Sequence, residues 1–417
     1  MVPDSRANAA GGGATTGTGR VGNVDVLRAL AAFAVLAGHA YALGGRPVPI
    51  KAQYWYDVPL ITTTTGVWLF FGISGYVISR PFVDRLVTGR PLPALVPYAV
   101  RRTLRIFPLY WICVTAVIVI DGTAGTQGWQ FPVHYALLQN LVPGRQLALF
   151  SVAWTLTLEV IFYAVLPILA LALRVRGRTP SAERVAALVL VSWGASVVFT
   201  VCGDLSGDGQ IGLWLRGSFP AMWQMFCPGI LLALVPHLRA PEWRRWLVDP
   251  LSSRRAQVAI VAILAVAAVL YAAAPLRYGV VVYQLAADAS RPLFAIGFGF
   301  LLGAAIRARP VRARWILHLG LVSYGIYLLH AVLLDFLYFD PVGRDLVPLP
   351  HGGLPAYLVH LVYLAIPTIL LAMASWRWFE RPLIDLGRRF GDRWSRRRSA
   401  NAGASPAPYV AAPERRG

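Results

Sequence analysis

An arginine and a histidine lie eleven residues apart in the first apolar segment of the chain, at Arg28 and His39. The segment 24–44 is otherwise apolar and long enough to cross a membrane, where an ionisable side chain is costly unless a partner compensates it. In a helix, eleven residues return to within about 20° of the same face and rise roughly 16 Å. One helix face therefore carries a guanidinium suited to anions and an imidazole suited to proton transfer or nucleophilic attack.

Two more ionisable residues, Glu159 and His330, are expected at a depth similar to that of His39. Glu159 lies in AWTLTLEVIFY, and His330 ends SYGIYLLH. Two imidazoles and a carboxylate at one level supply a base, a partner that fixes its tautomer, and a group that balances developing charge. We predict these three as catalytic residues. The alternatives are an interhelical hydrogen bond for each histidine and a structural pair with Arg or Tyr for the glutamate.

A second polar layer consists of arginines. Arg28 lies about one turn into the first apolar segment, and Arg101, Arg102 and Arg105 precede the third in RRTLRIFPLYW. Arginine presents a fork of donors that suits phosphate, and a helix start adds positive potential. We predict that these four residues bind an anionic substrate. Arg101 and Arg102 are equally compatible with the basic flank that many membrane helices carry.

Four residues are candidates for substrate binding or for supporting the catalytic groups. Ser74 lies between two glycines, where a helix or a ligand can approach the backbone closely. Trp154 opens the segment that carries the glutamate, and Tyr327 lies one turn before the histidine of SYGIYLLH. Asn140 belongs to FPVHYALLQNLV, which predicts an interfacial helix. Helix packing for Ser74 and Tyr327 and an ordinary surface loop for Asn140 are the alternatives.

Membrane helices must carry all these residues. Of the 417 residues, 57% are hydrophobic and 14% are charged, and the apolar residues form long runs between basic loops. This pattern predicts an all-α, polytopic membrane bundle with about ten transmembrane helices. The predicted spans are 24–44, 60–79, 106–121, 152–173, 185–202, 217–236, 257–275, 292–306, 316–338 and 356–376.

The net charge of +20 reflects this topology. Alternate loops hold four to six arginines each, whereas the loops between them hold one or two basic residues. The positive-inside rule then predicts that both termini lie in the cytoplasm. Nucleic acid is excluded as a partner because this alternation forms no contiguous basic face. We divide the chain into a disordered N-terminal tail at 1–23, a membrane domain at 24–382 and a basic, largely disordered tail at 383–417.

Taken together, the strings resemble the acyltransferase-3 family of integral membrane O-acyltransferases, from Val24 to about Pro382. Singly each motif is weak, but six of them occur in the family's order. The matching residues are Arg28 and His39; Ser74, Gly75 and Tyr76; Arg101 to Arg105 with Pro108 and Tyr110; Trp154, Thr155, Leu156 and Glu159; Ser323, Tyr324, Tyr327, Leu328 and His330; and Glu380, Arg381 and Pro382.

The resemblance implies transfer of an acyl group, usually acetyl from acetyl-CoA, to a sugar hydroxyl of a surface glycan, a lipid-linked saccharide or a glycosylated metabolite. Arg28 and the cluster Arg101 to Arg105 would hold the CoA phosphates. His39 would act as general base or as a transient acyl carrier, with Glu159 or His330 orienting it. The expected partners are membrane lipid, acyl-CoA and a saccharide acceptor in a bacterial plasma membrane, with no metal or permanently bound cofactor.

A transporter or flippase for an anionic or acylated solute is the main alternative. Such a protein also needs polar residues at two depths and a basic mouth. The two readings differ in a direct observation, because only an enzyme consumes acyl-CoA thioester in detergent. A purely structural membrane protein would leave Arg28, His39, Glu159 and His330 without a role. The residues leave the acceptor open between an envelope polysaccharide and a small glycosylated metabolite.

Overall fold

The computed structural model describes residues 22–43, 56–122, 128–174, 179–206, 209–239, 253–273, 281–339 and 353–403. Within these ranges the chain forms helices and no β-strand. The long helices are α1 (Gly22–Leu43), α3 (Gly66–Val87), α4 (Leu95–Asp121), α6 (Ala153–Leu173), α7 (Ala182–Leu205), α9 (Phe219–Leu234), α11 (Arg254–Ala273), α12 (Val281–Arg307), α14 (Ser323–Leu334), α16 (Gly353–Ser375) and α17 (Arg381–Gly403). The short helices are α2 (Asp57–Thr62), α5 (Gln130–Tyr135), α8 (Gln210–Gly217) and α13 (Arg314–Leu321), with single 3₁₀ turns at Thr63–Thr65, Gln139–Leu141 and Val235–His237.

The predicted membrane bundle is confirmed. Nine helical stretches in the described part of the chain are long and apolar enough to cross a membrane, and there are ten if a bent pair counts as one span. The bent pair is α13 with α14, which meet at 64° where the sequence predicts one continuous span over 316–338. The third span begins at Leu95 rather than at 106. The cytoplasmic placement of both termini stays a prediction.

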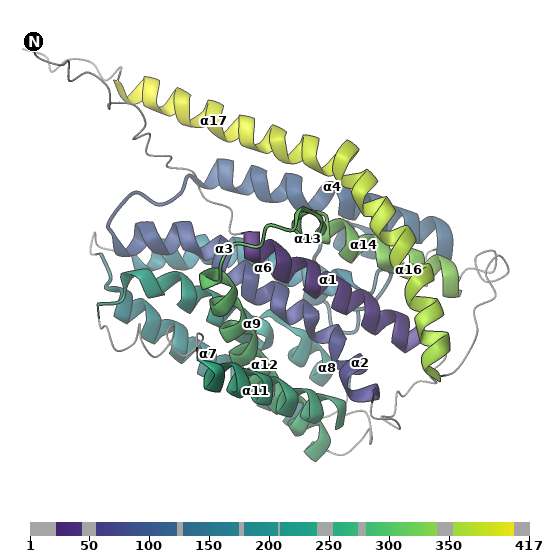
Figure 1. The fold of residues 1–417 in the computed structure, drawn as a ribbon. Helices are drawn as coiled ribbons and strands as arrows, with labels where there is room; N and C mark the ends of the chain where they lie inside the picture. Colours follow the sequence, from purple (N-terminus) through teal and green to yellow (C-terminus); the bar gives the residue numbers. More distant parts are fainter. Residues whose placement is uncertain are drawn as a thin grey trace, which may run out of the picture.

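Helices α1 and α3 lie in the interior of the bundle (Figure 1). Helix α1 packs against α3, α12, α13, α14 and α16, and α3 packs against α6, α9 and α12 as well. Glycines permit the closest of these contacts: a Cβ atom at Gly75 would clash with the backbone of Phe226, and one at Gly229 with the backbone of Gly72. The small residues beside Ser74 therefore serve helix packing, which was one of the two interpretations of that string.

The predicted disorder of 383–417 is wrong for its first part, because residues 381–403 form α17. Figure 1 shows this helix lying along α4 at the edge of the bundle. Gly387 and Gly391, one turn apart, are buried against α4, where their backbone faces Pro97, Arg101 and Leu104. The polar composition suggested a solvated tail, but two glycines on one face let the helix dock. Most of the predicted N-terminal tail, 1–21, and the end of the C-terminal tail, 404–417, lie outside the described residues.

Candidate active site

Two pockets lie back to back inside the bundle. The larger one, here the His39 pocket, has a volume of about 710 Å³. Its lining comes from α1, α3, α6, α8, α9, α11, α12 and α14, from the 3₁₀ turn Thr63–Thr65 and from the loop before α6. The smaller one, here the arginine pocket, has a volume of about 120 Å³ and contains Arg28, Arg102, Arg105 and Glu159. Val67, Thr155 and Tyr327 line both pockets and therefore form the wall between them.

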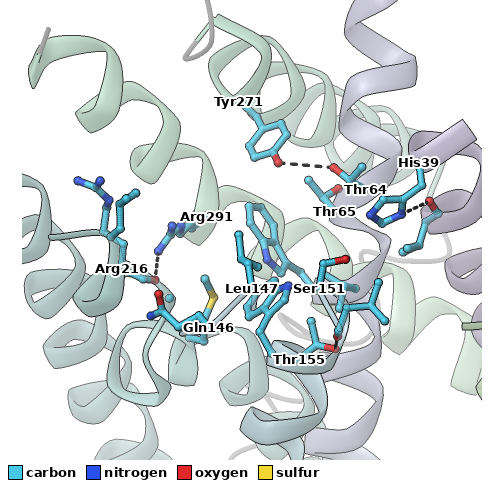
Figure 2. Close-up of a pocket in the computed structure, with 18 of the residues that line it drawn as sticks. His39, Thr64, Thr65, Gln146, Leu147, Ser151, Thr155, Arg216, Tyr271 and Arg291 are labelled. Atoms are coloured by element: carbon cyan, nitrogen blue, oxygen red, sulfur yellow. Dashed lines mark hydrogen bonds between the residues drawn. The ribbon is translucent and has the colours of Figure 1, made fainter. Parts of the chain in front are cut away.

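His39 and His330 form a pair at the edge of the larger pocket. Their rings lie 5.2 Å apart between centroids, and His330 Nε2 is 3.4 Å from His39 Nδ1. His39 lines the pocket, as Figure 2 shows, whereas His330 is fully buried and is not among the lining residues. The first histidine can therefore meet a substrate, and the second can act only through the first.

The backbone fixes the tautomer of both rings. His39 Nδ1 lies 2.9 Å from the Val35 carbonyl oxygen, and His330 Nδ1 lies 3.1 Å from that of Ile326. Carbonyl oxygens only accept hydrogen bonds, so each Nδ1 atom carries a proton and each Nε2 atom of a neutral ring carries a lone pair. His330 Nε2 accepts from His39, and His39 Nε2 has no partner among the described residues. A basic nitrogen thus faces the pocket.

Helix geometry explains this arrangement. Both carbonyls belong to residues four positions before their histidines, where the carbonyl of the preceding turn lies beside the side chain. Helix α14 reaches its position because the chain bends between α13 and α14. Helix α13 itself packs closely on α1: a Cβ atom at Gly320 of α13 would clash with the backbone of Asp25 in α1. The bend thus brings the end of SYGIYLLH to the His39 level of α1.

The arginine pocket surrounds a hydrogen-bonded glutamate. Ser74 Oγ donates to Glu159 Oε1 over 2.9 Å, and the Tyr163 hydroxyl donates to the same oxygen over a short distance. Arg102 lies over the Tyr163 ring, 5.2 Å from its centroid. Arg28 interacts electrostatically with the glutamate and with Arg105, and its buried Nε atom has no hydrogen-bond partner within the ranges that the structure describes. An orphaned guanidinium donor among three arginines fits a polyanionic ligand.

Glu380 adds a second carboxylate near this pocket. It ends a π-helical turn, Trp376–Glu380, which joins α16 to α17. Ser375 Oγ donates to its Oε1 atom over 3.0 Å, and the carboxylate interacts electrostatically with Arg105 and Arg28. Gly325 leaves room for it, because a Cβ atom there would lie 3.0 Å from Glu380 Oε1. A π-helical turn at such a place is typical of functional sites.

The structure places several predicted residues as expected. His39 and His330 are together, Trp154 lines the His39 pocket, and Ser74 lines the arginine pocket. Tyr327 lies in the wall between the pockets. The predicted roles of these residues stay predictions.

Three expectations about position are wrong. Glu159 does not join the two histidines but lies with the arginines, because its carboxylate bonds to Ser74 on α3 and to Tyr163 on α6; the α6 residue that reaches the His39 pocket is Thr155, one turn earlier. Arg101 is exposed and lies against α17 instead of lining the arginine pocket, because it and Arg102 point to different faces of α4. Asn140 lines neither pocket; its amide donates to the Trp154 carbonyl over 3.1 Å, so it holds the loop before α6.

Sequence reasoning assigned no role to other residues of these pockets. Thr155 and Tyr163 flank the glutamate by one turn on α6, which helical periodicity would have indicated. Arg216 and Arg291 line the His39 pocket although both lie just outside the predicted spans. The sequence feature that could have indicated them is that they are basic residues in loops that hold only one or two basic residues. Within the ranges that the structure describes, no group of three His, Cys, Asp or Glu side chains is placed to hold a metal ion.

Comparison with known proteins identifies the family of this chain. The family model for the acyltransferase domain of the acyltransferase-3 family matches residues 21–377. Nodulation protein 10 of Rhizobium leguminosarum bv. viciae is 25% identical over 391 residues, which cover 88% of this chain and 95% of that protein. No solved structure shows a significant match.

Proposed function

Because the chain belongs to the acyltransferase-3 family and forms a multi-pass membrane protein, we propose that it transfers an acetyl group from acetyl-CoA to a hydroxyl of a saccharide. The acceptor sugar would belong to a surface glycan, a lipid-linked saccharide or a glycosylated metabolite, and the membrane would be the bacterial plasma membrane. The observation that carries the proposal is the His39–His330 pair, which leaves one basic nitrogen facing a pocket of about 710 Å³.

In the proposed reaction His39 is the general base. Its Nε2 atom takes the proton of the acceptor hydroxyl as the oxygen attacks the thioester carbonyl carbon. The tetrahedral intermediate then collapses, the C–S bond breaks, and the CoA sulfur leaves with the proton returned from His39. During the protonated stage, His39 Nδ1 still donates to the Val35 carbonyl and to His330 Nε2. His330 is therefore a positioning residue that stabilises the imidazolium.

The arginine pocket is the proposed site for the phosphates of CoA. Three arginines and one glutamate line it, and the buried Nε–H group of Arg28 can donate a hydrogen bond to a ligand. The pocket of about 120 Å³ accommodates only a part of the donor. The acyl end would have to cross the wall at Thr155 and Tyr327 to reach His39, which lies roughly 16 Å along α1 from Arg28. On the predicted topology, this pocket lies on the cytoplasmic side of the bundle, where CoA is found.

The first experiment measures release of free CoA from acetyl-CoA by the purified protein in detergent, with and without an envelope-saccharide acceptor. We expect acceptor-dependent release that His39→Ala lowers by 10²–10⁴-fold, the usual contribution of a general base. His237→Ala is the matched control, because His237 lies in the loop after α9 and lines neither pocket. Activity of His39→Ala equal to that of wild type would remove His39 from the mechanism, and no thioester consumption by either protein would favour the transporter reading.

A pre-steady-state measurement distinguishes the two possible roles of His39, general base and acyl carrier. If His39 itself carried the acyl group, mixing with acetyl-CoA in the absence of acceptor would release about one CoA per protein molecule in a burst. We expect no burst, because the ring faces the pocket as a base with its second nitrogen bonded to Val35 and His330. A burst that is lost in His39→Ala would establish the acyl carrier instead.

A further inference from the structure

Two arginines that the proposed reaction does not use lie on the wall of the His39 pocket. Arg216 comes from α8 and Arg291 from α12, and their side chains are only 9% and 13% exposed. Figure 2 shows both of them across the pocket from His39. A molecule bound at His39 would therefore extend towards these two guanidinium groups.

Each arginine has an aspartate as its partner, and both aspartates lie outside the pocket lining. Arg291 Nε is 2.7 Å from Asp288 Oδ1, three residues earlier on α12, and Arg216 Nη1 is 3.5 Å from Asp204 Oδ1 on α7. Asp204 is fully buried, and no acidic residue belongs to the lining among the described residues. The aspartates orient the arginines from behind, so the pocket surface itself carries positive charge only.

Arg291 retains donors for a ligand. A guanidinium has five N–H donors in a planar fork. The Nε atom of Arg291 binds Asp288, and one Nη1 proton is donated to the Arg216 carbonyl oxygen over 2.9 Å. The other three N–H groups have no hydrogen-bond partner among the residues that the structure describes. A fork held rigidly at two points with three donors left suits a carboxylate or a phosphate.

Stability does not explain this cluster. Burying an ion pair removes charge from water, and apolar residues of similar size are often as stable or more stable in its place. Ionisable groups inside a membrane protein mark functional sites for the same reason. Arg216 and Arg291 also belong to loops that are otherwise poor in basic residues, so the positive-inside rule does not account for them either.

The rest of the pocket suits a sugar. Its wall includes the aromatic rings of Trp68, Trp154 and Tyr271, on which the apolar faces of sugar rings can stack, and the amides of Gln146 and Gln210. Gln146 Nε2 donates to the Trp214 carbonyl over 3.0 Å, which leaves its oxygen to accept from a hydroxyl. The volume of about 710 Å³ lies within the range of ordinary small-molecule sites.

We propose that the acceptor is an anionic saccharide, whose carboxylate or phosphate group binds Arg291 and Arg216 while the hydroxyl to be acylated faces His39. The inference rests on the proposed function in one respect only: it identifies the bound saccharide as the acceptor of the acyl group. The shared chemistry is a pair of anionic oxygens on a sugar, from a uronic acid or from a sugar phosphate.

Equilibrium dialysis of the full-length protein in detergent tests this without acyl-CoA. The uronate arm compares digalacturonic acid with the neutral disaccharide galactobiose, and the phosphate arm compares N-acetylglucosamine 1-phosphate with N-acetylglucosamine. We expect at least tenfold tighter binding of the anion in one arm, which identifies the source of the charge. In Arg291→Gln this preference should fall to within twofold, while the neutral sugar binds as before.

Two further variants make the result specific. Arg174→Gln is the matched control, since Arg174 also donates to backbone carbonyls, those of Gly89 and Arg90, but lies at the other end of α6 and lines neither pocket. Arg291→Gln leaves Asp288 as an unpaired buried charge, which could prevent folding. The double variant Asp288→Asn/Arg291→Gln removes that charge as well and tests the same loss of anion binding in a protein without it. Equal binding of anionic and neutral sugars by wild type, no binding of any probe, or an anion preference that survives both Arg291 variants would overturn the proposal.

The same assay distinguishes this inference from the proposed function. Binding does not require chemistry, so His39→Ala should retain the anion preference although its CoA release is 10²–10⁴-fold lower. A protein that binds the anionic sugar through Arg291 but consumes no thioester would refute the acyl transfer and keep the binding site. A protein that releases CoA on a neutral sugar as well as on its anionic counterpart would keep the enzyme and refute the anionic site.

Discussion

The hydroxyl oxygens of Tyr327 and Thr155 lie 2.7 Å apart in the wall between the His39 pocket and the arginine pocket. Both also lie within hydrogen-bond distance of the Val152 carbonyl, at 3.1 Å and 3.0 Å. Each hydroxyl has one proton, so one donates to the carbonyl and the other donates to its neighbour. In the proposed reaction, this triangle lies where the acyl group would have to pass from one pocket to the other.

Tyr327→Phe should weaken this barrier. The ring remains, but the hydroxyl bond to Thr155 is lost, and a neutral hydrogen bond contributes about 1 kcal/mol, or roughly fivefold in an equilibrium. We expect hydrolysis of acetyl-CoA without acceptor to rise about fivefold. The measurement is CoA release in detergent. Tyr135→Phe is the matched control, because its hydroxyl also lies 2.7 Å from a threonine hydroxyl, that of Thr115, outside both pockets. Unchanged hydrolysis in Tyr327→Phe would show that the wall is not a barrier.

Replacement of His330 should lower kcat and leave KM for both substrates nearly unchanged. His330 lies behind His39 and is fully buried, so it contacts His39 but not the pocket. Partners that orient metal-bound histidines contribute about 10–100-fold, and by analogy we expect a loss of about that size in His330→Ala. His330→Gln should recover part of kcat, because its amide oxygen can accept from His39 Nδ1. A variant with unchanged kcat, or a change confined to KM, would contradict this role.

The membrane helices were predictable because lipid leaves the backbone almost no alternative to a helix. Apolar length alone therefore identified α1, α7, α11 and α16 to within a few residues. The bend between α13 and α14 was not predictable in this way, since apolar content is continuous through it. Helix α17 was missed for the opposite reason: its composition is polar, and two glycines that contact α4 determine its packing.

The relative positions of site residues were predictable only where both residues lie on the same helix. Arg28 and His39 share α1, so periodicity and rise placed them at two depths of one face. Glu159 was assigned to the histidines because counting residues along the helix gave it a similar depth. Depth alone does not show which side chains a residue meets, and Glu159 bonds to Ser74 on α3 and Tyr163 on α6. Arg216 and Arg291 are brought together by the packing of α7, α8 and α12. No pattern within one segment of the sequence indicates such a contact between helices.

Arg28→Gln should raise KM for acetyl-CoA about tenfold while kcat changes little. A hydrogen bond to a charged group contributes about 1.5–3 kcal/mol, and tenfold in affinity is about 1.4 kcal/mol. The acetyl thioester of pantetheine lacks the nucleotide phosphates, so its kinetics should be the same in the variant and in wild type. Arg101→Gln is the matched control: Arg101 lies against α17 and not in the pocket, so its KM should stay within twofold of wild type. Equal effects on both donors would refute phosphate binding by Arg28.

His134, which lies outside the membrane-spanning helices, should make the protein less stable in mild acid. It is 1% exposed, neither ring nitrogen has a hydrogen-bond partner among the described residues, and burial together with the charge of Arg145 lowers its pKa from the usual 6.5. Below pH 6.5 the unfolded chain therefore binds a proton that the folded protein excludes. Stability should be full above pH 6.5 and should decline as the pH falls towards the lowered folded-state pKa.

Thermal unfolding in detergent between pH 5 and 8 measures this effect. The fall in Tm below pH 6.5 should be smaller in His134→Gln, which cannot take up a proton, than in wild type. His237→Gln is the matched control, because that ring is partly exposed near Asp84 and its replacement should not flatten the curve. A His134→Gln variant with the same pH dependence as wild type would show that this histidine is protonated equally in the folded and unfolded states, and would exclude its burial as the cause.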